Sequence, residues 1–260
     1  MIPTAGIVAI AILLSKPAAD EARALVRDVE AATADLRDFR AGVIVERVDS
    51  LTEESERRSG QVILEAASSG RRFAISFDSF IGPDGRADES RRQFVYDSGW
   101  LAEIDFERKQ FVNRQIVAPG ELFDPLRVGE GPLPLPLGQR AEEVFARFEV
   151  EPASPPERGL LRHLSGVRGV RLTPKPGLPE REETESVDLF YDASTLLPRG
   201  VLQRRPNGDR VEVLLREPRM NEGLDENARS LLTIRTPDPR DGWAVDVRPW
   251  SRRREGADGE

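Results

Sequence analysis

The segment Phe94–Ile116 reads FVYDSGWLAEIDFERKQFVNRQI, and bulky apolar residues alternate in it with polar ones. In the part WLAEIDF, most apolar side chains share one face of a strand, and Glu103 and Asp105 share the other face with Leu101. A period of two is typical of a strand with one buried and one solvated face. A turn at Ser98–Gly99 separates two such strands, so the segment predicts an antiparallel meander.

The same period extends from this segment in both directions along the chain. Alternating runs precede it in VIVERV, QVILEAA and RRFAISF, and others follow it in RHLSGVRGVRLTP, ESVDLFYD, LLPRGVLQRR, RVEVLLR and RSLLTIRT. Short polar turns join most of these runs, which favours pairing of sequential strands. We therefore expect a mostly β (α+β) fold in which both halves of the chain share one large antiparallel sheet.

The first residues follow a different pattern. Ala5–Leu14 is an unbroken apolar run that is too short to span a membrane as a helix, and small residues suited to cleavage follow it in KPAAD. These features predict a signal peptide over residues 1–19 and export of the protein, although no basic residue precedes the run. Beyond it, apolar residues at helical spacing predict an amphipathic helix packed on the sheet. These residues are Leu25, Val29, Ala32, Leu36 and Phe39.

A proline-rich segment interrupts the strands near the middle of the chain. Residues 118–138 read APGELFDPLRVGEGPLPLPLG, in which leucine and phenylalanine accompany the proline and glycine. Proline cannot donate to a strand ladder, and a plain linker would be polar, so this segment must lie against apolar surface. A short helix over 139–148 follows, with Val144, Phe145 and Phe148 on its buried side. Overall we expect a single domain over 20–250 and a disordered tail over 251–260.

Composition narrows the function classes. The chain has no cysteine and a single histidine, His163, so thiolate chemistry and sites built on several histidines are excluded. The net charge of −8 opposes binding to a nucleic-acid backbone. We find no phosphate-binding glycine loop and no metal-ligand spacing, and we expect no cofactor. A hydrolytic carboxylate pair needs a cleft, and the four acids of the first segment are explained by the solvated face of a strand. These acids are Asp97, Glu103, Asp105 and Glu107.

The apolar residues leave two interpretations open. They could form an ordinary core beneath a helix, or they could line a cavity on one face of the sheet that the leucine-rich segment covers as a lid. The residues expected in a lipid cavity are Phe73, Ile75, Phe77, Trp100, Ile104, Phe106 and Leu189. The residues expected in the lid are Leu126, Leu133, Leu135, Leu137 and Phe145.

The order of these motifs resembles the LolA-type outer-membrane lipoprotein carriers. The first segment is similar to their central hairpin, VRLTPKP is similar to their Leu-Thr-Pro-Lys strand end, and residues 186–226 are similar to their closing strands. The resemblance extends from about Asp20 to Asp246. It implies an open half-barrel, in which one strongly bent antiparallel sheet has an N-terminal helix and a helical or irregular lid over an apolar concave face.

The resemblance also implies a function. It implies a periplasmic carrier that takes acylated lipoproteins or lipids from an inner-membrane release complex to an outer-membrane acceptor, without catalysis. We also expect a monomer. The family closes its lid with an arginine that precedes a proline. Here the comparable stretch, EAASSGRRF, lacks that pair, and Arg71 and Arg72 are the candidates for a lid lock. An envelope sensor or interaction module of the same fold is the alternative function, and a carboxylate-based hydrolase is a more distant one.

Overall fold

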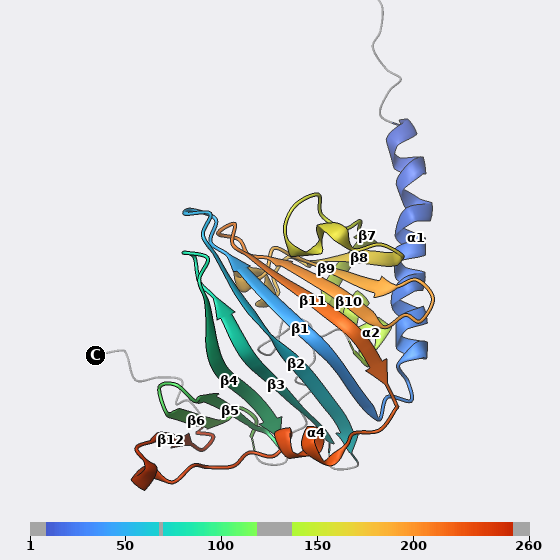
Figure 1. The fold of residues 1–260 in the computed structure, drawn as a ribbon. Helices are drawn as coiled ribbons and strands as arrows, with labels where there is room; N and C mark the ends of the chain where they lie inside the picture. Colours follow the sequence, from blue (N-terminus) through green and yellow to red (C-terminus); the bar gives the residue numbers. More distant parts are fainter. Residues whose placement is uncertain (1–8, 68–69, 119–136, 252–260) are drawn as a thin grey trace, which may run out of the picture. The chain divides into compact units, whose positions relative to one another are not determined.

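The computed structural model describes residues 9–67, 70–118 and 137–251. Twelve strands form one sheet in the order β12-β6-β5-β4-β3-β2-β1-β11-β10-β9-β8-β7 (Figure 1). Their bounds are β1 Asp38–Val48, β2 Ser55–Ala67, β3 Gly70–Ile81, β4 Ala87–Asp97, β5 Trp100–Asp105, β6 Gln110–Gln115, β7 Phe148–Pro152, β8 Val167–Pro174, β9 Ser186–Asp192, β10 Pro198–Arg204, β11 Arg210–Met220 and β12 Ala244–Arg248.

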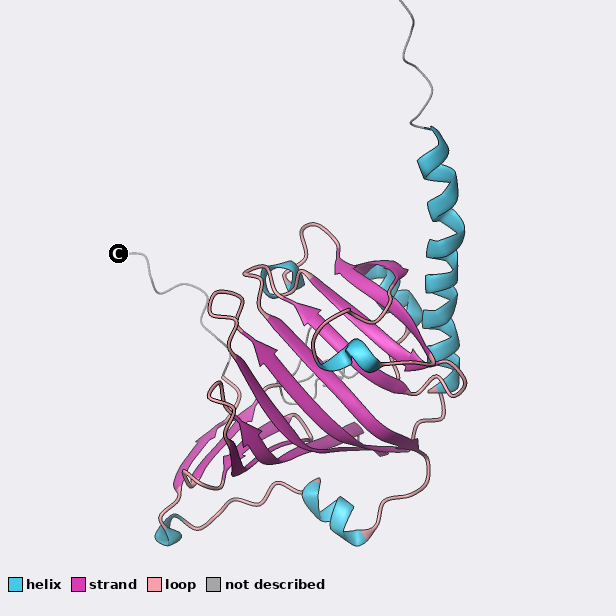
Figure 2. Cartoon of the chain, turned by 45° about the horizontal axis from the view of Figure 1, so that its top comes forward, coloured by secondary structure: helices cyan, strands magenta, loops and turns pink. Residues whose placement is uncertain are grey.

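The sheet is open, because β12 and β7 stand at the two ends of the strand order. Strand makes up most of the regular structure, and the helices are few and mostly short (Figure 2). They are α1 Ala9–Ala32, α2 Ala141–Arg147, α3 Glu180–Glu183 and α4 Glu226–Leu231, with 3-10 turns η1 Leu160–His163 and η2 Pro239–Asp241. The prediction of a mostly β fold with one large open sheet is confirmed.

The opening segment forms the predicted meander. It contributes the end of β4, then β5 and β6, which pair antiparallel in sequence. Ser98 and Gly99 both have positive φ, at 51° and 84°, as the two central residues of a tight hairpin turn require. Glycine adopts this conformation without strain, which explains its place in the turn.

The strands and helices fall into two compact units. Unit 1 comprises Met1–Leu36, Ile44–Arg57 and Leu126–Pro218, and unit 2 comprises Arg37–Val43, Arg58–Pro125 and Arg219–Glu260. The single domain over 20–250 stays a prediction.

In unit 1, α1 lies against β7 and β8 and contacts α2 (Figure 1). Ala22, Leu25 and Val29 are buried on one side of this helix, as the spacing predicts. The helix runs without a break through Ala18 and ends at Ala32. None of its described portion is both long enough and apolar enough to span a membrane.

Two residues of the expected helical face were assigned wrongly. Leu36 lies beyond the end of α1, and Phe39 is a fully buried residue of β1. At the end of the helix the N–H and the hydroxyl of Thr33 both donate to the carbonyl of Val29, at 3.0 and 2.8 Å, and a turn follows.

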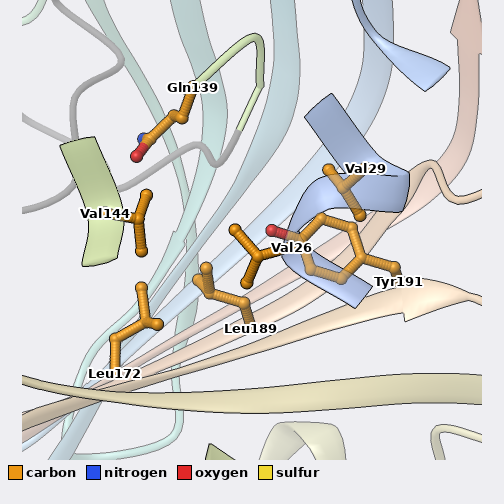
Figure 3. A pocket seen from close by; sticks show the side chains of 7 residues that line it. All are labelled: Val26, Val29, Gln139, Val144, Leu172, Leu189 and Tyr191. Carbon is orange, nitrogen blue, oxygen red and sulfur yellow. The ribbon is translucent and has the colours of Figure 1, made fainter. Parts of the chain in front are cut away.

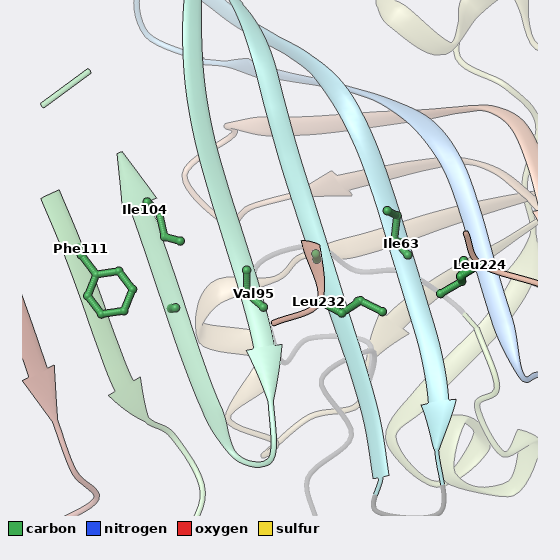
Figure 4. Packing of buried hydrophobic residues seen from close by; sticks show 8 residues of the cluster. Ile63, Val95, Ile104, Phe111, Leu224 and Leu232 are labelled. Atoms are coloured by element: carbon green, nitrogen blue, oxygen red, sulfur yellow. The ribbon is translucent and has the colours of Figure 1, made fainter. Parts of the chain in front are cut away.

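In unit 2, one apolar cluster joins strands β2 to β6 to the segment that follows β11. Leu224 and Leu232 lie over Ile63 and Val95, beside Ile104 and Phe111 (Figure 4). All of these side chains are less than 8% exposed. The burial of Leu232 fixes this segment on the sheet.

Several local assignments from the sequence were incorrect. The stretch RSLLTIRT, predicted as a strand, instead contains the end of α4 and a turn. The carboxylate of Asp225 accepts a hydrogen bond from the N–H of Ala228 at 2.8 Å and caps that helix. The strands β7 and β12 were not predicted. β12 pairs parallel to β6, so the sheet is not antiparallel throughout.

Candidate functional site

A small apolar pocket lies in unit 1 between α1, α2 and the strands β8 and β9. It is lined by Val26, Val29, Gln139, Val144, Leu172, Leu189 and Tyr191 (Figure 3). Its volume is about 20 Å³, which is room for about one water molecule. This pocket is therefore closed and has no room for a larger apolar guest.

The strand register explains why these side chains meet. Leu172 pairs with Val187 and Val170 pairs with Leu189, so these four residues share one face of β8 and β9. Tyr191 follows Leu189 on the same face because side chains two residues apart point the same way. The face is apolar by period-two patterning, and α1 supplies Val26 and Val29 opposite it (Figure 3).

The two helices above the pocket are joined by polar contacts. The carboxylate of Glu30 on α1 accepts a hydrogen bond from the N–H of Ala141, the first residue of α2, at 3.2 Å. The guanidinium carbons of Arg23 and Arg27 lie 3.8 and 5.1 Å from the ring centroid of Phe145 on α2. A cation over an aromatic face is worth about 0.5–2 kcal/mol, so these contacts hold α1 and α2 together.

The pocket carries little charge. Burial raises the pKa of the Tyr191 phenol well above its usual value of 10.0, so the hydroxyl stays neutral. Asp28 and Arg168 form an ion pair at 3.4 Å between α1 and β8, with both side chains more than 40% exposed. An uncharged lining suits an apolar ligand, since no buried charge would need a partner.

The structure divides the residues that the sequence placed in a lipid cavity. Leu189 lines the pocket of unit 1. In unit 2, the pairing of Ile75 with Phe94 and of Val95 with Ala102 places the other six on two opposite faces of the sheet. Phe73, Ile75 and Phe77 share one face with Phe94 and Tyr96, whereas Trp100, Ile104 and Phe106 belong to the other.

The first of these faces is a buried aromatic cluster. Phe73 stacks on Tyr96 with ring centroids 5.7 Å apart, and Phe77 meets Phe94 edge to face at 6.4 Å. Phe73, Ile75 and Phe77 are each at most 6% exposed. The other face carries Ile104 into the cluster of Figure 4. Phe106 packs against that cluster and contacts Trp243. The six residues therefore do not converge on one cavity, and their role in lipid binding stays a prediction.

The expected lid is described only in part. Leu126, Leu133 and Leu135 lie outside the described residues. Leu137 is fully buried, and Phe145 is a buried residue of α2 beneath the two arginines of α1.

The expected lid lock lies on β3 in unit 2. Arg72 donates to Glu65 of β2, from Nε at 2.7 Å and also from Nη2. Glu65 lies 3.6 Å from Arg229 of α4 as well. Arg71 is half-buried on the same strand. These contacts tie Arg72 to its neighbouring strand, and the lid-lock role of both arginines stays a prediction.

Two carboxylates of the opening segment, Asp105 and Glu107, are engaged in local contacts. Asp105 accepts hydrogen bonds from the N–H of Arg108 at 2.9 Å and from Arg92 at 3.1 Å. Burial opposes ionisation of Asp105, but these hydrogen bonds outweigh it and hold its pKa below the usual value of 3.8. Glu107 accepts from the N–H of Arg91 at 2.7 Å. The lowered pKa of Asp105 is the reverse of what a general acid needs. In the described ranges, no three His, Asp or Glu side chains cluster as metal ligands would.

Four of the seven residues that line the pocket were not predicted from the sequence. Val29 and Val144 were placed on buried helix faces, but Val26, Gln139, Leu172 and Tyr191 were not singled out. The signal for Leu172 and Tyr191 was present in the alternation of VRLTP and VDLFYD. What was missing is the pairing of those strands beneath α1, which a pattern within one strand does not specify.

Comparison with solved structures finds similar folds at low sequence identity. A chain in the complex structure of Pseudomonas aeruginosa MucA/MucB is 14% identical, with a TM-score of 0.43, over 81% of this chain and 60% of that one. The chain therefore spans about 60% of the length of that relative. A LolA superfamily protein from Nitrosomonas europaea is 7% identical, with a TM-score of 0.33, over 79% and 96% of the two chains.

The Mycobacterium tuberculosis lipoprotein LppX is 11% identical, with a TM-score of 0.39, over 79% of this chain and 98% of that one. No family model matches the sequence, and no curated protein matches it. One similar structure is thus a member of the superfamily that the sequence motifs resemble. Because each TM-score is below 0.5, these likenesses do not bear on what the protein binds.

Proposed function

We propose that the protein binds an acyl chain of a lipid or lipoprotein between α1, α2 and the strands β8 and β9. The observation that carries the proposal is the uncharged, apolar pocket roofed by two helices that side-chain contacts join. In this proposal the protein acts in the periplasm and carries acylated cargo from the inner to the outer membrane, as the family resemblance implies.

Energetics support a roof that opens. Burying acyl CH₂ groups is worth about 0.8 kcal/mol each, so a chain of about 16 carbons could contribute on the order of 12 kcal/mol. A site that bound the chain with that full free energy would release its cargo slowly. To admit a chain, the closed pocket, about 20 Å³ in volume, must first lose contacts that α1 makes with α2 and with β8. That cost offsets part of the gain and makes release possible.

The first experiment is native mass spectrometry of the protein purified from the periplasm of its own cell. We expect co-purifying acyl lipid or acylated peptide. The same protein, stripped of lipid, should then take up a fluorescent fatty-acyl probe. A clean mass together with no probe uptake would overturn the proposal and favour the interaction module.

A matched pair of variants locates the site. Leu172 is 1% exposed and lines the pocket, whereas Leu202 is 2% exposed and packs on the other side of the sheet against Leu161 and Phe190. Overpacking either position costs about 1–3 kcal/mol of stability. We expect Leu172→Trp to lose probe uptake and Leu202→Trp to retain it. Equal loss in both variants would place the probe elsewhere.

A further inference from the structure

Among the strands that the structure describes, β12 pairs on one side only and forms one edge of the sheet. It pairs with β6 in parallel register, from Ala244 opposite Gln110 to Arg248 opposite Arg114. The N–H of Ala244 donates to the carbonyl of Lys109 at 2.9 Å, which turns its backbone groups toward β6. Alternate residues of a strand direct these groups to opposite sides. The N–H and carbonyl groups of Val245 and Val247 therefore point outward, and in the described chain β12 ends the strand order.

The side chains of β12 carry opposite charges around its centre. Asp246 and Arg248 lie on one face and form an ion pair in which both side chains are more than 40% exposed. The hydrogen bond and charge of Arg248 lower the pKa of Asp246, with Arg114 adding to the effect. Val247 lies between them on the opposite face and is 48% exposed. The edge is thus a short charged strand with an exposed apolar residue in the middle.

Exposed apolar side chains also lie at this end of the sheet. Ile116, directly after β6, is 39% exposed, and Trp250, two residues after β12, is 37% exposed. The N–H of Trp250 donates to the side chain of Gln115 at 3.2 Å, which holds Trp250 beside the end of β6. With Val247, these are three of the four large apolar residues that are exposed in the described chain. An exposed edge bordered by apolar residues is a template for strand addition.

We propose that β12 pairs antiparallel with β12 of a second copy of this chain, about a two-fold axis at Val247. In this register Asp246 of each copy lies opposite Arg248 of the other, so two attractive pairs form across the axis. The outward N–H and carbonyl of Val247 meet the same groups of the other copy and form two hydrogen bonds. The occupant is a second copy because the strand is complementary in charge to itself.

Neighbouring registers lack this complementarity. Centring the axis on Asp246 would place Asp246 opposite Asp246, which is unfavourable. Centring it on Val245 would place Asp246 opposite Ala244, where no charge meets it. Pro249 has no N–H to donate at the outward edge, so the ladder stops there. A two-fold pairing also uses up the edge, so the assembly closes as a dimer.

The contact is short, so association should be weak and depend on concentration. The sequence predicts a monomer, and the proposed dimer should dissociate into monomers at low concentration. The proposal concerns unit 2 alone and does not depend on lipid binding by unit 1.

A charge-reversal experiment tests the register. Sedimentation velocity over a concentration series should show a monomer–dimer equilibrium for the wild type. Asp246→Arg alone and Arg248→Asp alone place like charges opposite each other, and each variant should stay monomeric. In a mixture of the two variants, the introduced arginine of one copy lies opposite the introduced aspartate of the other, and the remaining native Arg248 lies opposite the remaining native Asp246. The mixture should therefore regain the wild-type dimer, and an ion pair within one chain cannot produce that recovery.

A backbone variant tests the edge itself. Val247→Pro removes the outward N–H but no bond to β6, so the fold should survive, as circular dichroism can check, and the dimer should be lost. Val247→Thr keeps the N–H and the β-branched shape and should still dimerise. Three results would overturn the proposal: a monomer at every concentration, a mixture that stays monomeric, or a dimer that persists in Val247→Pro. If the protein is monomeric at every concentration, an extended segment of another protein would instead be the candidate to pair with the edge of β12.

Discussion

Arg171 and Asp188 face each other across β8 and β9, and the guanidinium donates two hydrogen bonds to the carboxylate, at 2.7 and 2.9 Å. Asp188 is only 1% exposed and also accepts a hydrogen bond from Arg204 of β10 at 2.8 Å. The hydrogen bond to Asp188 raises the pKa of Arg171. One buried carboxylate thus connects three neighbouring strands of unit 1.

Replacing this carboxylate should destabilise unit 1. Breaking a fully buried ion pair costs about 3–5 kcal/mol, and we expect about 2 kcal/mol for Asp188→Asn because Arg171 and Arg204 keep access to water. Urea unfolding monitored by circular dichroism measures the change. Asp28→Asn is the control, because that carboxylate is about half exposed, and it should cost less than about 1 kcal/mol. Equal costs would contradict a structural role for Asp188.

The pH dependence of stability should report on Glu212. This carboxyl group is 1% exposed, and burial raises its pKa above the usual 4.5, against the opposing hydrogen bond from the N–H of Leu161. The folded state then binds the proton more tightly than the unfolded state, so this group lowers the free energy of unfolding as pH rises through the window above 4.5. Relative to Glu212→Gln, the wild type should therefore gain stability as pH falls from about 7 toward that value.

Asp105 provides the comparison of opposite sign. Its pKa is lowered from 3.8, so its ionised form stabilises the fold above that value, and the contribution is lost as pH falls through the folded pKa. The wild type should therefore lose its advantage over Asp105→Asn in acid. Unfolding by urea across a pH series measures both differences. Parallel curves for the Glu212→Gln and Asp105→Asn variants would contradict these assignments.

A glycine of β2 should be intolerant of any side chain. A Cβ at Gly60 would lie 1.9 Å from the carbonyl oxygen of Ser76 and 2.7 Å from the Cα of Phe77, and backbone atoms cannot move aside cheaply. Overpacking typically lowers the free energy of unfolding by roughly 1–3 kcal/mol. Gly60→Ala should lower it further, by about 1 kcal/mol or more beyond that range. Gly85→Ala is the control, because its Cβ would meet nothing within 4 Å and only its φ of 74° opposes the change. That variant should lose about 1–2 kcal/mol in urea unfolding.

The roof of the pocket should loosen when its aromatic anchor is removed. Phe145→Ala takes away the ring that Arg23 and Arg27 cover, and loss of a buried phenylalanine costs about 3–5 kcal/mol. If acyl chains enter beneath α2, a fluorescent fatty-acyl probe should bind faster to this variant than to the wild type. Stopped-flow fluorescence gives the rate.

Phe190→Ala is the matched control for this experiment. Phe190 is also buried, but it packs with Leu161 and Leu202 on the face away from the pocket. It should lose similar stability without faster probe uptake. Faster uptake in both variants would show that general instability, and not opening of the roof, admits the probe.

Patterns within single segments carried most of the strand assignments. Alternation in WLAEIDF and the Ser98–Gly99 turn were sufficient to pair β4 with β5, because a two-residue hairpin pairs strands that are adjacent in sequence. The resemblance to LolA-type carriers added that the sheet is open. The lining of the pocket could not be predicted this way, since Val26 and Leu172 are far apart in sequence and meet only when α1 packs on β8.

The sequence by itself determined that the protein is mostly β, because period-two burial is a local property of each strand. Tertiary structure alone decided the register between neighbouring strands and which elements pack on each face of the sheet. The register of β3, β4 and β5 separates Phe73 from Trp100, although both begin apolar runs that look alike. Tertiary contacts also decided that residues around Leu232 form a helix end and a turn, and that β12 joins β6 in parallel. These outcomes depend on contacts between residues distant in sequence, which local propensity does not encode.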